Sequence, residues 1–393
     1  MNHSTHFSEE PAAAAASNRV RGVPRPGLAL VTARFQLAQP DQPAPDAWRE
    51  GLDGLLGWLG IVAEFVPVAP SRRLPRMTDW ALPAASGATR RAPVFAPWLG
   101  WSPSAFQHGG LAGMPSAQFA ASYLTDQGSG RGAAQAAGID LVLLSPHPAL
   151  CTTEDAGGVP MPRVDVLKAM IRAARNEGRD KLAIILHARQ RNAIARQLLA
   201  ADRALTREGL AIEILTIEEA LRPLMAGASA WDAIIAMPDL RSTVFTLLAE
   251  ASGVRGPWPM LWQGGDALLV CCEAAGEGTI RPSLDAPALV QALALVLHHS
   301  GANRAAWRLH EAWARMRDTG LTTPGRGSDA PYVNAIKDAD FIAMLCRGQA
   351  GSKRPVKPWR ALGQAEPPNS GSLFGGLRVV ASNPADSPHW KGC

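Results

Sequence analysis

The sequence lacks any long apolar segment. No uninterrupted apolar run approaches the roughly 20 residues that a membrane-spanning helix needs. The first twenty residues also lack a charged start followed by an apolar core, so we expect residues 1–19 to form a flexible leader and not a signal peptide. These absences argue against a membrane protein, and we expect no membrane partner.

Cysteine is scarce and its spacing carries no pattern. The 393 residues include five cysteines, an odd number, and no CxxC or Cys/His metal-binding spacing is present. A disulfide framework and a structural zinc site are therefore not indicated. Free thiols at this frequency favour a reducing compartment, and the sequence predicts a cytoplasmic protein.

Several catalytic signatures are also missing. The chain contains no GxSxG nucleophile turn, no HExxH zinc helix and no Gly-Lys-Ser/Thr phosphate loop. It therefore shows no sign of an α/β-type serine hydrolase, a zinc protease or a P-loop nucleotidase. Internal repeats are absent as well.

Positive charge is concentrated at one end. Residues 347–393 contain seven Lys or Arg and two Asp or Glu, a net charge of +5 that equals the net charge of the whole chain. The same stretch is rich in Pro, Gly and Ser, which predicts a disordered basic tail. Since the rest of the chain is neutral, we expect no specific nucleic-acid partner.

The part of the chain after residue 138 alternates between short apolar runs and amphipathic segments. This alternation predicts an α/β fold with a largely parallel central sheet. The predicted strands are 139–144, 182–186, 211–215, 232–237 and 267–272. The predicted helices are 163–178, a long helix that ends near 208, 217–225, 240–251, 286–299, 303–318 and 330–345.

The first third of the chain is less regular. A strand is expected at 28–31, a helix at 48–59 and a second strand at 61–68. Residues 70–138 carry many Pro, Gly and Trp and little periodicity, which predicts long loops with short helices.

Three segments resemble one enzyme family. They are Ile139-Asp140-Leu141-Val142-Leu143, the run Trp231-Asp232-Ala233-Ile234-Ile235 followed by Pro238-Asp239-Leu240, and Thr322-Thr323-Pro324-Gly325-Arg326-Gly327. In order and character they are similar to segments of the isocitrate and isopropylmalate dehydrogenases, the β-decarboxylating dehydrogenases. The similarity extends over about 138–345 and more faintly over 28–68.

The resemblance implies a two-domain fold of the isopropylmalate dehydrogenase type. Residues 20–138 together with 254–346 would form a larger domain, and 139–253 a smaller, dimer-forming domain. It also implies NAD(P) and a divalent cation, Mg²⁺ or Mn²⁺, that polarises the substrate carbonyl. A homodimer, or a heteromer with an active paralogue, follows because the family builds its site across two subunits, and the expected ligand is a small hydroxy acid.

Five residues are candidates for the family's site. His187 follows the strand whose end carries the family's proton-handling Lys, and an imidazole can serve as a base near neutral pH. Glu218 and Asp239 lie where metal-binding carboxylates are expected, although acids at a helix start also have purely structural reasons. Glu273 and Arg281 lie where the family's adenosine loop begins and continues.

Other positions depart from the family's pattern. Ser145 replaces a substrate-binding Arg, and Thr243 and Leu247 fall where two metal-binding aspartates are expected. The family's glycine turn after its first strand is replaced by Thr32-Ala33-Arg34-Phe35-Gln36. Arg90 and Arg91 could replace lost substrate arginines, or simply lie on the surface.

Three functions fit this combination. The first is a catalytically degenerate family member that acts as a non-catalytic or ligand-responsive subunit. The second is an active NAD(P)- and metal-dependent hydroxy-acid dehydrogenase with a rebuilt site, in which His187 is the base. The third is an interaction module whose basic tail recruits a partner.

Overall fold

The structure of the chain is a computed structural model. The structure describes residues 31–37, 46–67, 93–95, 97, 118–126, 139–152, 158–200, 210–228, 230–252, 256–264, 268–274, 284–324, 334–348 and 355–363. The predicted leader at 1–19, the site candidate Arg281 and the pair Arg90 and Arg91 lie outside these ranges.

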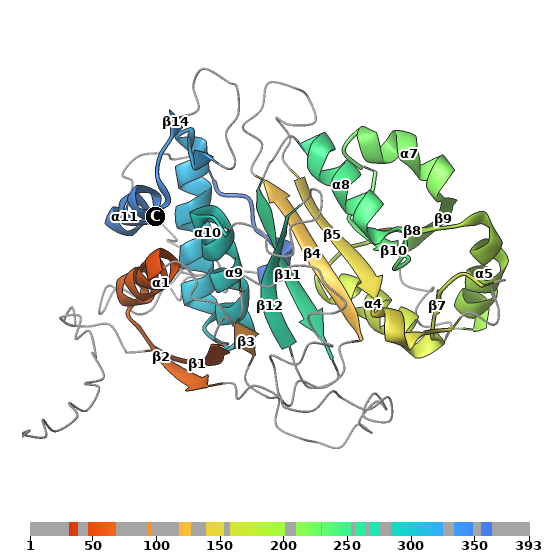
Figure 1. Cartoon of the computed structure of the whole chain (residues 1–393), viewed down its shortest axis with the longest axis horizontal. Helices are drawn as coiled ribbons and strands as arrows, with labels where there is room; N and C mark the ends of the chain where they lie inside the picture. Colours follow the sequence, from red (N-terminus) through yellow and green to blue (C-terminus); the bar gives the residue numbers. More distant parts are fainter. Residues whose placement is uncertain are drawn as a thin grey trace, which may run out of the picture.

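A ten-stranded mixed sheet runs through the described part of the molecule (Figure 1). Its strand order is β2-β1-β3-β12-β11-β4-β5-β10-β8-β9. The bounds are β1 Val31–Leu37, β2 Ile61–Pro67, β3 Val94–Phe95, β4 Phe119–Asp126, β5 Ile139–Pro146, β8 Lys181–Leu186, β9 Ala211–Thr216, β10 Ala233–Ala236, β11 Pro257–Gln263 and β12 Leu268–Ala274. Two small ladders pair β6 (Cys151–Thr152) with β7 (Met161–Pro162), and β13 (Leu321–Thr322) with β14 (Asn334–Ala335).

The sheet consists of two parallel groups of strands joined by antiparallel strands. β2, β1, β3 and β12 form the first parallel group, and β5, β10, β8 and β9 form the second. Between them, β11 and β4 pair antiparallel with each other and with their outer neighbours. Three successive antiparallel pairings reverse the direction three times, so the two groups run in opposite directions. The α/β fold with a largely parallel sheet is confirmed.

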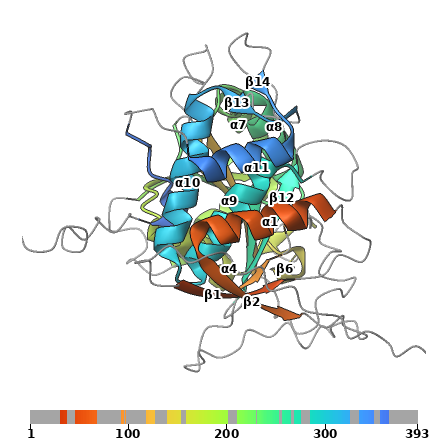
Figure 2. The same cartoon turned by 90° about the vertical axis from the view of Figure 1, so that its left-hand side faces the viewer.

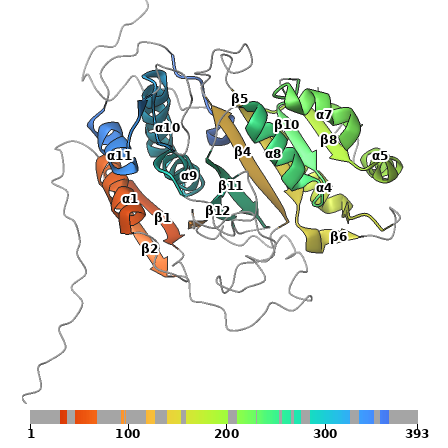
Figure 3. The same ribbon diagram turned by 45° about the horizontal axis from the view of Figure 1, so that its top comes forward.

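Helices cover both faces of the sheet, as Figure 3 shows. On one face lie α1 (Asp46–Leu59), α4 (Val164–Asn176), α5 (Arg191–Ala200), α9 (Ala286–His299), α10 (Asn303–Asp318) and α11 (Asp338–Arg347). On the other face lie α7 (Ile217–Met225) and α8 (Arg241–Ser252). Each face carries its own apolar cluster because strand side chains alternate between faces: Val142 and Leu144 of β5 join one, Leu141 and Leu143 the other.

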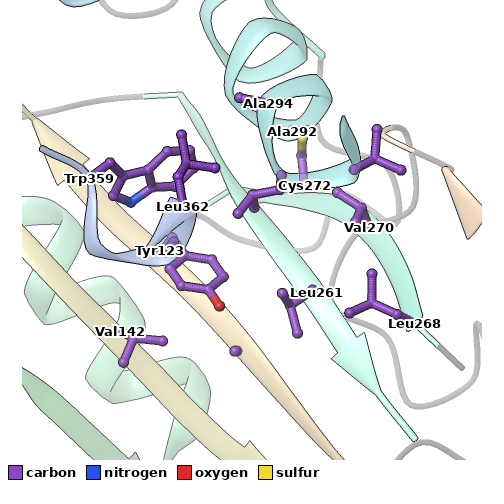
Figure 4. Close-up of a cluster of buried hydrophobic side chains, with 14 of the residues drawn as sticks. Tyr123, Val142, Leu261, Leu268, Val270, Cys272, Ala292, Ala294, Trp359 and Leu362 are labelled. Carbon is purple, nitrogen blue, oxygen red and sulfur yellow. The ribbon is translucent and has the colours of Figure 1, made fainter. Parts of the chain in front are cut away.

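Helix α9 lies at the centre of the larger cluster. Its residues from Ala286 to Leu297 are all buried, because the sheet, α10, α1 and α11 surround it (Figure 2). The amphipathic helix α10 packs against it with the stripe Leu309, Trp313 and Met316, which is at most 1% exposed. Figure 4 shows part of this cluster, with Cys272 of β12 facing Ala292. In the described residues, no helix combines the length and the apolar character that a membrane span requires.

Several predicted elements need correction. The first strand is β1 (Val31–Leu37), so residues 32–36 lie in a strand and not in a turn. The prediction of loops over 70–138 is wrong at β3 and at β4, which lies in the middle of the sheet. The predicted helix at 330–345 is a short strand, β14, followed by α11 from Asp338.

The C-terminal part also differs from its prediction. The prediction of a disordered tail from residue 347 is wrong for the segment 355–363, which includes the 3-10 turn η6 (Arg360–Leu362). Trp359 and Leu362 of this segment are each 1% exposed. The proposed division into domains at 138 and 254 stays a prediction, and its first boundary falls between the paired strands β4 and β5.

Candidate functional site

Three of the predicted site residues lie at one edge of the second parallel group. His187 directly follows β8, Glu218 lies in the first turn after β9, and Asp239 follows β10 by three residues. These strands are parallel neighbours, so their carboxyl ends lie at the same edge of the sheet. Ligands in α/β proteins bind outside the carboxyl ends of parallel strands.

His187 and Asp239 form a hydrogen-bonded pair at this edge. His187 Nε2 lies 2.7 Å from Asp239 Oδ2, and the two side chains are 36% and 34% exposed. The backbone of His187 is fixed in turn: its N–H donates to Gln190 Oε1 at 2.7 Å, and Gln190 Nε2 donates to the carbonyl of Pro160 at 2.6 Å. A carboxylate that orients an imidazole is the arrangement a general base needs.

Glu218 and Glu219 differ in their surroundings. Glu219 closes a capping box at the start of α7, accepting from Thr216 N at 2.8 Å, and it also pairs with Arg191. The pKa of Glu218 is lowered by the backbone N–H that it accepts from, by the Thr216 hydroxyl and, more weakly, by His187. Glu218 is therefore an ionised carboxylate that interacts electrostatically with His187.

His147 and Cys151 follow β5 at the same edge, and the sequence did not single them out. His147 is 1% exposed, its Nδ1 accepts from Ala149 N at 3.1 Å, and its ring packs against Trp262 with centroids 5.7 Å apart. Burial lowers the pKa of His147 to about 4. Burial and the charge of Asp239 raise the pKa of Cys151 to about 12. At neutral pH this edge therefore holds a neutral imidazole and a protonated thiol, and the thiol is not a nucleophile.

The pKa of His147 predicts a loss of stability in acid. Between pH 6.5 and about 4 the unfolded chain binds a proton at His147 and the folded chain does not. The free energy of unfolding then falls by about 1.4 kcal/mol per pH unit, roughly 3 kcal/mol in all. We expect His147→Asn, which keeps an acceptor for Ala149 N but does not titrate, to remove this part of the acid dependence in urea unfolding at pH 4.5 and 7. An unchanged acid dependence would contradict the assignment.

Glu273 lies in a buried cluster inside the sheet. It is 5% exposed, and both of its carboxylate oxygens pair with the guanidinium of Arg241, one of them at 2.6 Å from Nη2. The Ser122 hydroxyl donates to Glu273 Oε2 at 2.7 Å and accepts from Arg241 Nη2 at 2.6 Å. The cluster ties β12 to β4 and to the start of α8, so both carboxylate oxygens of Glu273 are already engaged.

The residues present do not fit the divalent cation that the family resemblance implies. Among the described residues, no three His, Cys, Asp or Glu side chains gather closely enough to hold a metal ion. On α8, Thr243 is exposed and Leu247 packs into the apolar cluster, so neither position supplies a carboxylate. Mg²⁺ needs several oxygen ligands to replace its hydration shell, and Glu218 with Asp239 offers too few. Their role as metal ligands stays a prediction without support from this geometry.

Side chains that could bind an anionic substrate are also scarce at this edge in the described part of the chain. Ser145 is fully buried, and its Oγ has no hydrogen-bond partner in the structure, so it does not reach a substrate carboxylate as an Arg would. Arg191 is paired with Glu219. A shallow pocket of about 160 Å³ does occur in the described part of the chain, but it is lined by α1, α10 and α11, including Trp58, Arg308 and Arg315, on the side of the first parallel group.

Comparison with known proteins identifies the fold. The sequence matches no protein-family model and no curated protein. Among solved structures, the chain is similar to isocitrate dehydrogenase from Methylococcus capsulatus, with a TM-score of 0.53 and 14% identity over 80% of this chain and 98% of that one. It is also similar to the TT0538 protein from Thermus thermophilus, with a TM-score of 0.53 and 14% identity over 84% of this chain and 71% of that one.

These similarities define the class of fold. The chain is an α/β protein with a fold like that of isocitrate dehydrogenase. At 14% identity the likeness extends to the fold alone.

Proposed function

We propose that the chain is a divergent relative of the isocitrate and isopropylmalate dehydrogenases that does not catalyse oxidative decarboxylation and acts as a non-catalytic subunit. The proposal rests on the side chains that occupy the positions of the family's site residues. Glu273 is bound by Arg241, Ser145 is a buried hydroxyl, and the half-buried Leu247 packs against the apolar cluster. Loss of CO₂ from a β-keto acid needs a cation to stabilise the developing enolate, and a paired carboxylate, a buried hydroxyl and a leucine offer it no free carboxylate ligand.

The charges at the carboxyl ends of β8, β9 and β10, called the carboxyl edge, support the same proposal. Glu218 is ionised and lies near His187, which is paired with Asp239, while the charges of Arg191 and Glu219 offset each other. The carboxylates of Glu218 and Asp239 place negative charge next to His187, which opposes binding of the carboxylates of isocitrate, isopropylmalate or malate. We therefore expect hydroxy acids to bind only weakly at neutral pH, so a response to such a ligand is not the main role of the site.

A thermal-shift series tests this proposal without relying on turnover. A ligand that binds only the folded protein raises the melting temperature once its concentration exceeds its dissociation constant. We expect no upward shift from millimolar isocitrate, isopropylmalate, malate or tartrate, each with Mg²⁺ or Mn²⁺ and with NAD⁺ or NADP⁺. A shift that needs metal, hydroxy acid and nucleotide together would indicate an assembled dehydrogenase site and contradict the proposal.

The second candidate function, an active enzyme with a rebuilt site, has one observation in its favour. The 2.7 Å contact between His187 and Asp239 is an oriented base at the ligand-binding edge of the sheet. If the protein turns over a substrate, replacing His187 by Ala should lower kcat by a factor of about 10²–10⁴. Arg222→Ala, which removes an exposed side chain from α7, is the matched control.

We also propose that the subunit pairs with a second copy, or with an active paralogue, through α7. Leu221 and Met225 lie one helical turn apart on this helix and are 41% and 68% exposed. Burial of these two side chains against a partner would remove apolar surface from water. We expect the double change Leu221→Lys and Met225→Lys to shift the mass measured by light scattering from dimer to monomer, with Leu199→Lys, at an exposed apolar residue of α5, as control. A parent protein that is already monomeric would contradict self-pairing.

A further inference from the structure

The segment 355–363 crosses from one parallel group of the sheet to the other. It follows α11 and places Trp359, Ala361 and Leu362 in the core, with exposures of 1%, 5% and 1%. Pro355, Lys357, Pro358 and Gly363 stay exposed. A short stretch that buries one large aromatic residue directly after two exposed prolines is a docked segment and not part of an α-helix or a sheet.

One side of the segment is bound to helices that pack on the first parallel group. His310 of α10 lies with its Nε2 3.1 Å from the carbonyl of Lys357. Its ring stacks on Trp359 with centroids 5.7 Å apart and an interplanar angle of 28°. Burial lowers the pKa of His310, so the ring is neutral and Nε2–H donates to the carbonyl. Leu362 lies beside Trp359 in the same cluster, close to Tyr123 (Figure 4).

The other side is bound to the amino ends of the second parallel group. The backbone N–H of Arg360 donates to Asp140 Oδ2 at 3.2 Å, and its guanidinium forms an ion pair with Asp232 Oδ1 at 2.9 Å. Asp140 lies near the start of β5, and Asp232 directly precedes β10. Arg360 therefore contacts two neighbouring strands at the edge opposite to His187.

The two carboxylates that hold Arg360 are themselves fixed. Arg179 donates to Asp140 Oδ1 and to the carbonyl of Asp232, each at 2.9 Å, and its side chain is completely buried. Asp232 Oδ2 accepts from the backbone N–H groups of Asp180 and Lys181 at 3.3 Å and 3.2 Å. Arg360 is thus attached to a rigid set of groups, and not to mobile surface side chains.

We propose that residues 355–363 act as a strap that holds the two parallel groups in one relative orientation. Besides the strap, the antiparallel ladders of β11 and β4, the buried pair of Arg241 and Glu273 and the larger apolar cluster link the two groups. The strap adds a link at the amino ends of β5 and β10. Trp359 anchors the strap on one side and Arg360 latches it on the other. Release of the Arg360 latch, with Trp359 still docked, lets the second group and its carboxyl edge move. The inference is independent of the proposed function, because it concerns orientation and not chemistry.

Double electron–electron resonance tests the strap, because it measures the distance between two spin labels, one on each group, in the whole chain. Spin labels replace the exposed Leu199 of α5 and the exposed Arg304 of α10, in a background in which Cys151, Cys346 and Cys393 are Ser. We expect a single narrow distance distribution for this parent. Arg360→Ala should broaden the distribution or add a second distance, while Arg222→Ala, an exposed Arg far from the strap, should leave it narrow.

Two outcomes would overturn the strap. One is a folded Arg360→Ala protein whose distance distribution is as narrow as that of the parent. The other is an equal broadening in Arg222→Ala, which would show that the change is unspecific. If the alanine variant does not fold, Arg360→Gln, which keeps most of the side chain, replaces it, and its distance distribution is compared with that of the parent. Hydrogen exchange provides a second readout: the amides at 139–142 and 232–235 should exchange at least about tenfold faster in the variant, and those of α10 should not.

Discussion

Replacing Glu273 by Ala should destabilise the protein by about 3–5 kcal/mol. The change leaves the buried guanidinium of Arg241 without its counter-charge, in a site that is closed to water. Breaking a buried ion pair by removing one partner has this magnitude, because the remaining charge stays desolvated. Urea unfolding followed by circular dichroism measures the change, and Glu250→Ala, on the exposed face of α8, is the control.

A double variant makes this prediction sharper. Arg241→Met combined with Glu273→Leu removes both charges and fills the space with apolar groups of similar size. We expect it to recover most of the stability that the single variant loses, since an apolar replacement of a buried pair is often neutral. If Glu273 instead served mainly to bind a nucleotide, the single variant would keep its stability and lose only nucleotide binding.

Replacing Arg179 by Met should have a comparably large effect, a loss of about 3–5 kcal/mol. Arg179 is a hub at the amino ends of β5, β8 and β10: it donates to Asp140, to two backbone carbonyls, and to Glu177 at 2.8 Å. Glu177 in turn accepts from the Tyr123 hydroxyl at 2.7 Å. Burial and the charge of Glu177 raise the pKa of Tyr123 well above its usual value, so this hydroxyl stays a donor.

The measurement for Arg179 is again urea unfolding, with Arg172→Met as the matched control. Arg172 belongs to the same region of the chain, at the exposed side of α4. A Lys at position 179 should rescue little, because one ammonium group does not reproduce the planar fork that bonds to several acceptors. Equal stability of the Met variant and the parent would show that this network contributes little to folding.

Much of the second parallel group could be predicted from the sequence. Its strands, such as 182–186 and 211–215, are apolar runs flanked by amphipathic helices, and the structure places them within one or two residues of the prediction. The central strands β4 and β11 could not be found in this way. β4 (Phe119–Asp126) combines small and polar residues, and β11 (Pro257–Gln263) contains two prolines.

The prolines of β11 agree with the pairing that is observed. Pro259 has no N–H to donate, and the ladder between β11 and β4 begins only at Met260, whereas the ladder with β12 extends over the whole strand. A strand of this kind is defined by its neighbours and not by its own sequence. Local patterns therefore cannot reveal it.

The candidate site was predictable as a set of positions but not as a geometry. His187, Glu218 and Asp239 each follow a predicted strand, which places them at one edge. The pairing of His187 with Asp239, 52 residues apart, depends on β10 lying beside β8, and no local pattern specifies strand order. His147 was missed, although its position directly after β5 was a signal for it too, and Cys151, at the start of β6, carried no such signal.

Glu273 and the C-terminal strap show two other limits of the sequence. The buried partner of Glu273 comes from α8, 32 residues away, so only the folded chain shows that its carboxylate is already paired. The strap lies in a basic, Pro-rich stretch whose composition is that of a disordered tail. Its order comes from one buried Trp and one latched Arg, which composition does not resolve.

The most direct test of the central claim is a turnover assay on the purified protein. Isocitrate, isopropylmalate, malate and tartrate are each supplied with Mg²⁺ or Mn²⁺ and with NAD⁺ or NADP⁺, and reduced nucleotide is followed by its absorbance. We expect no formation above the rate of a protein-free control, because the groups that would hold the cation and the substrate carboxylates are absent or already paired. Sustained reduction of either nucleotide with any of these acids, lost on replacing His187 by Ala, would contradict the account.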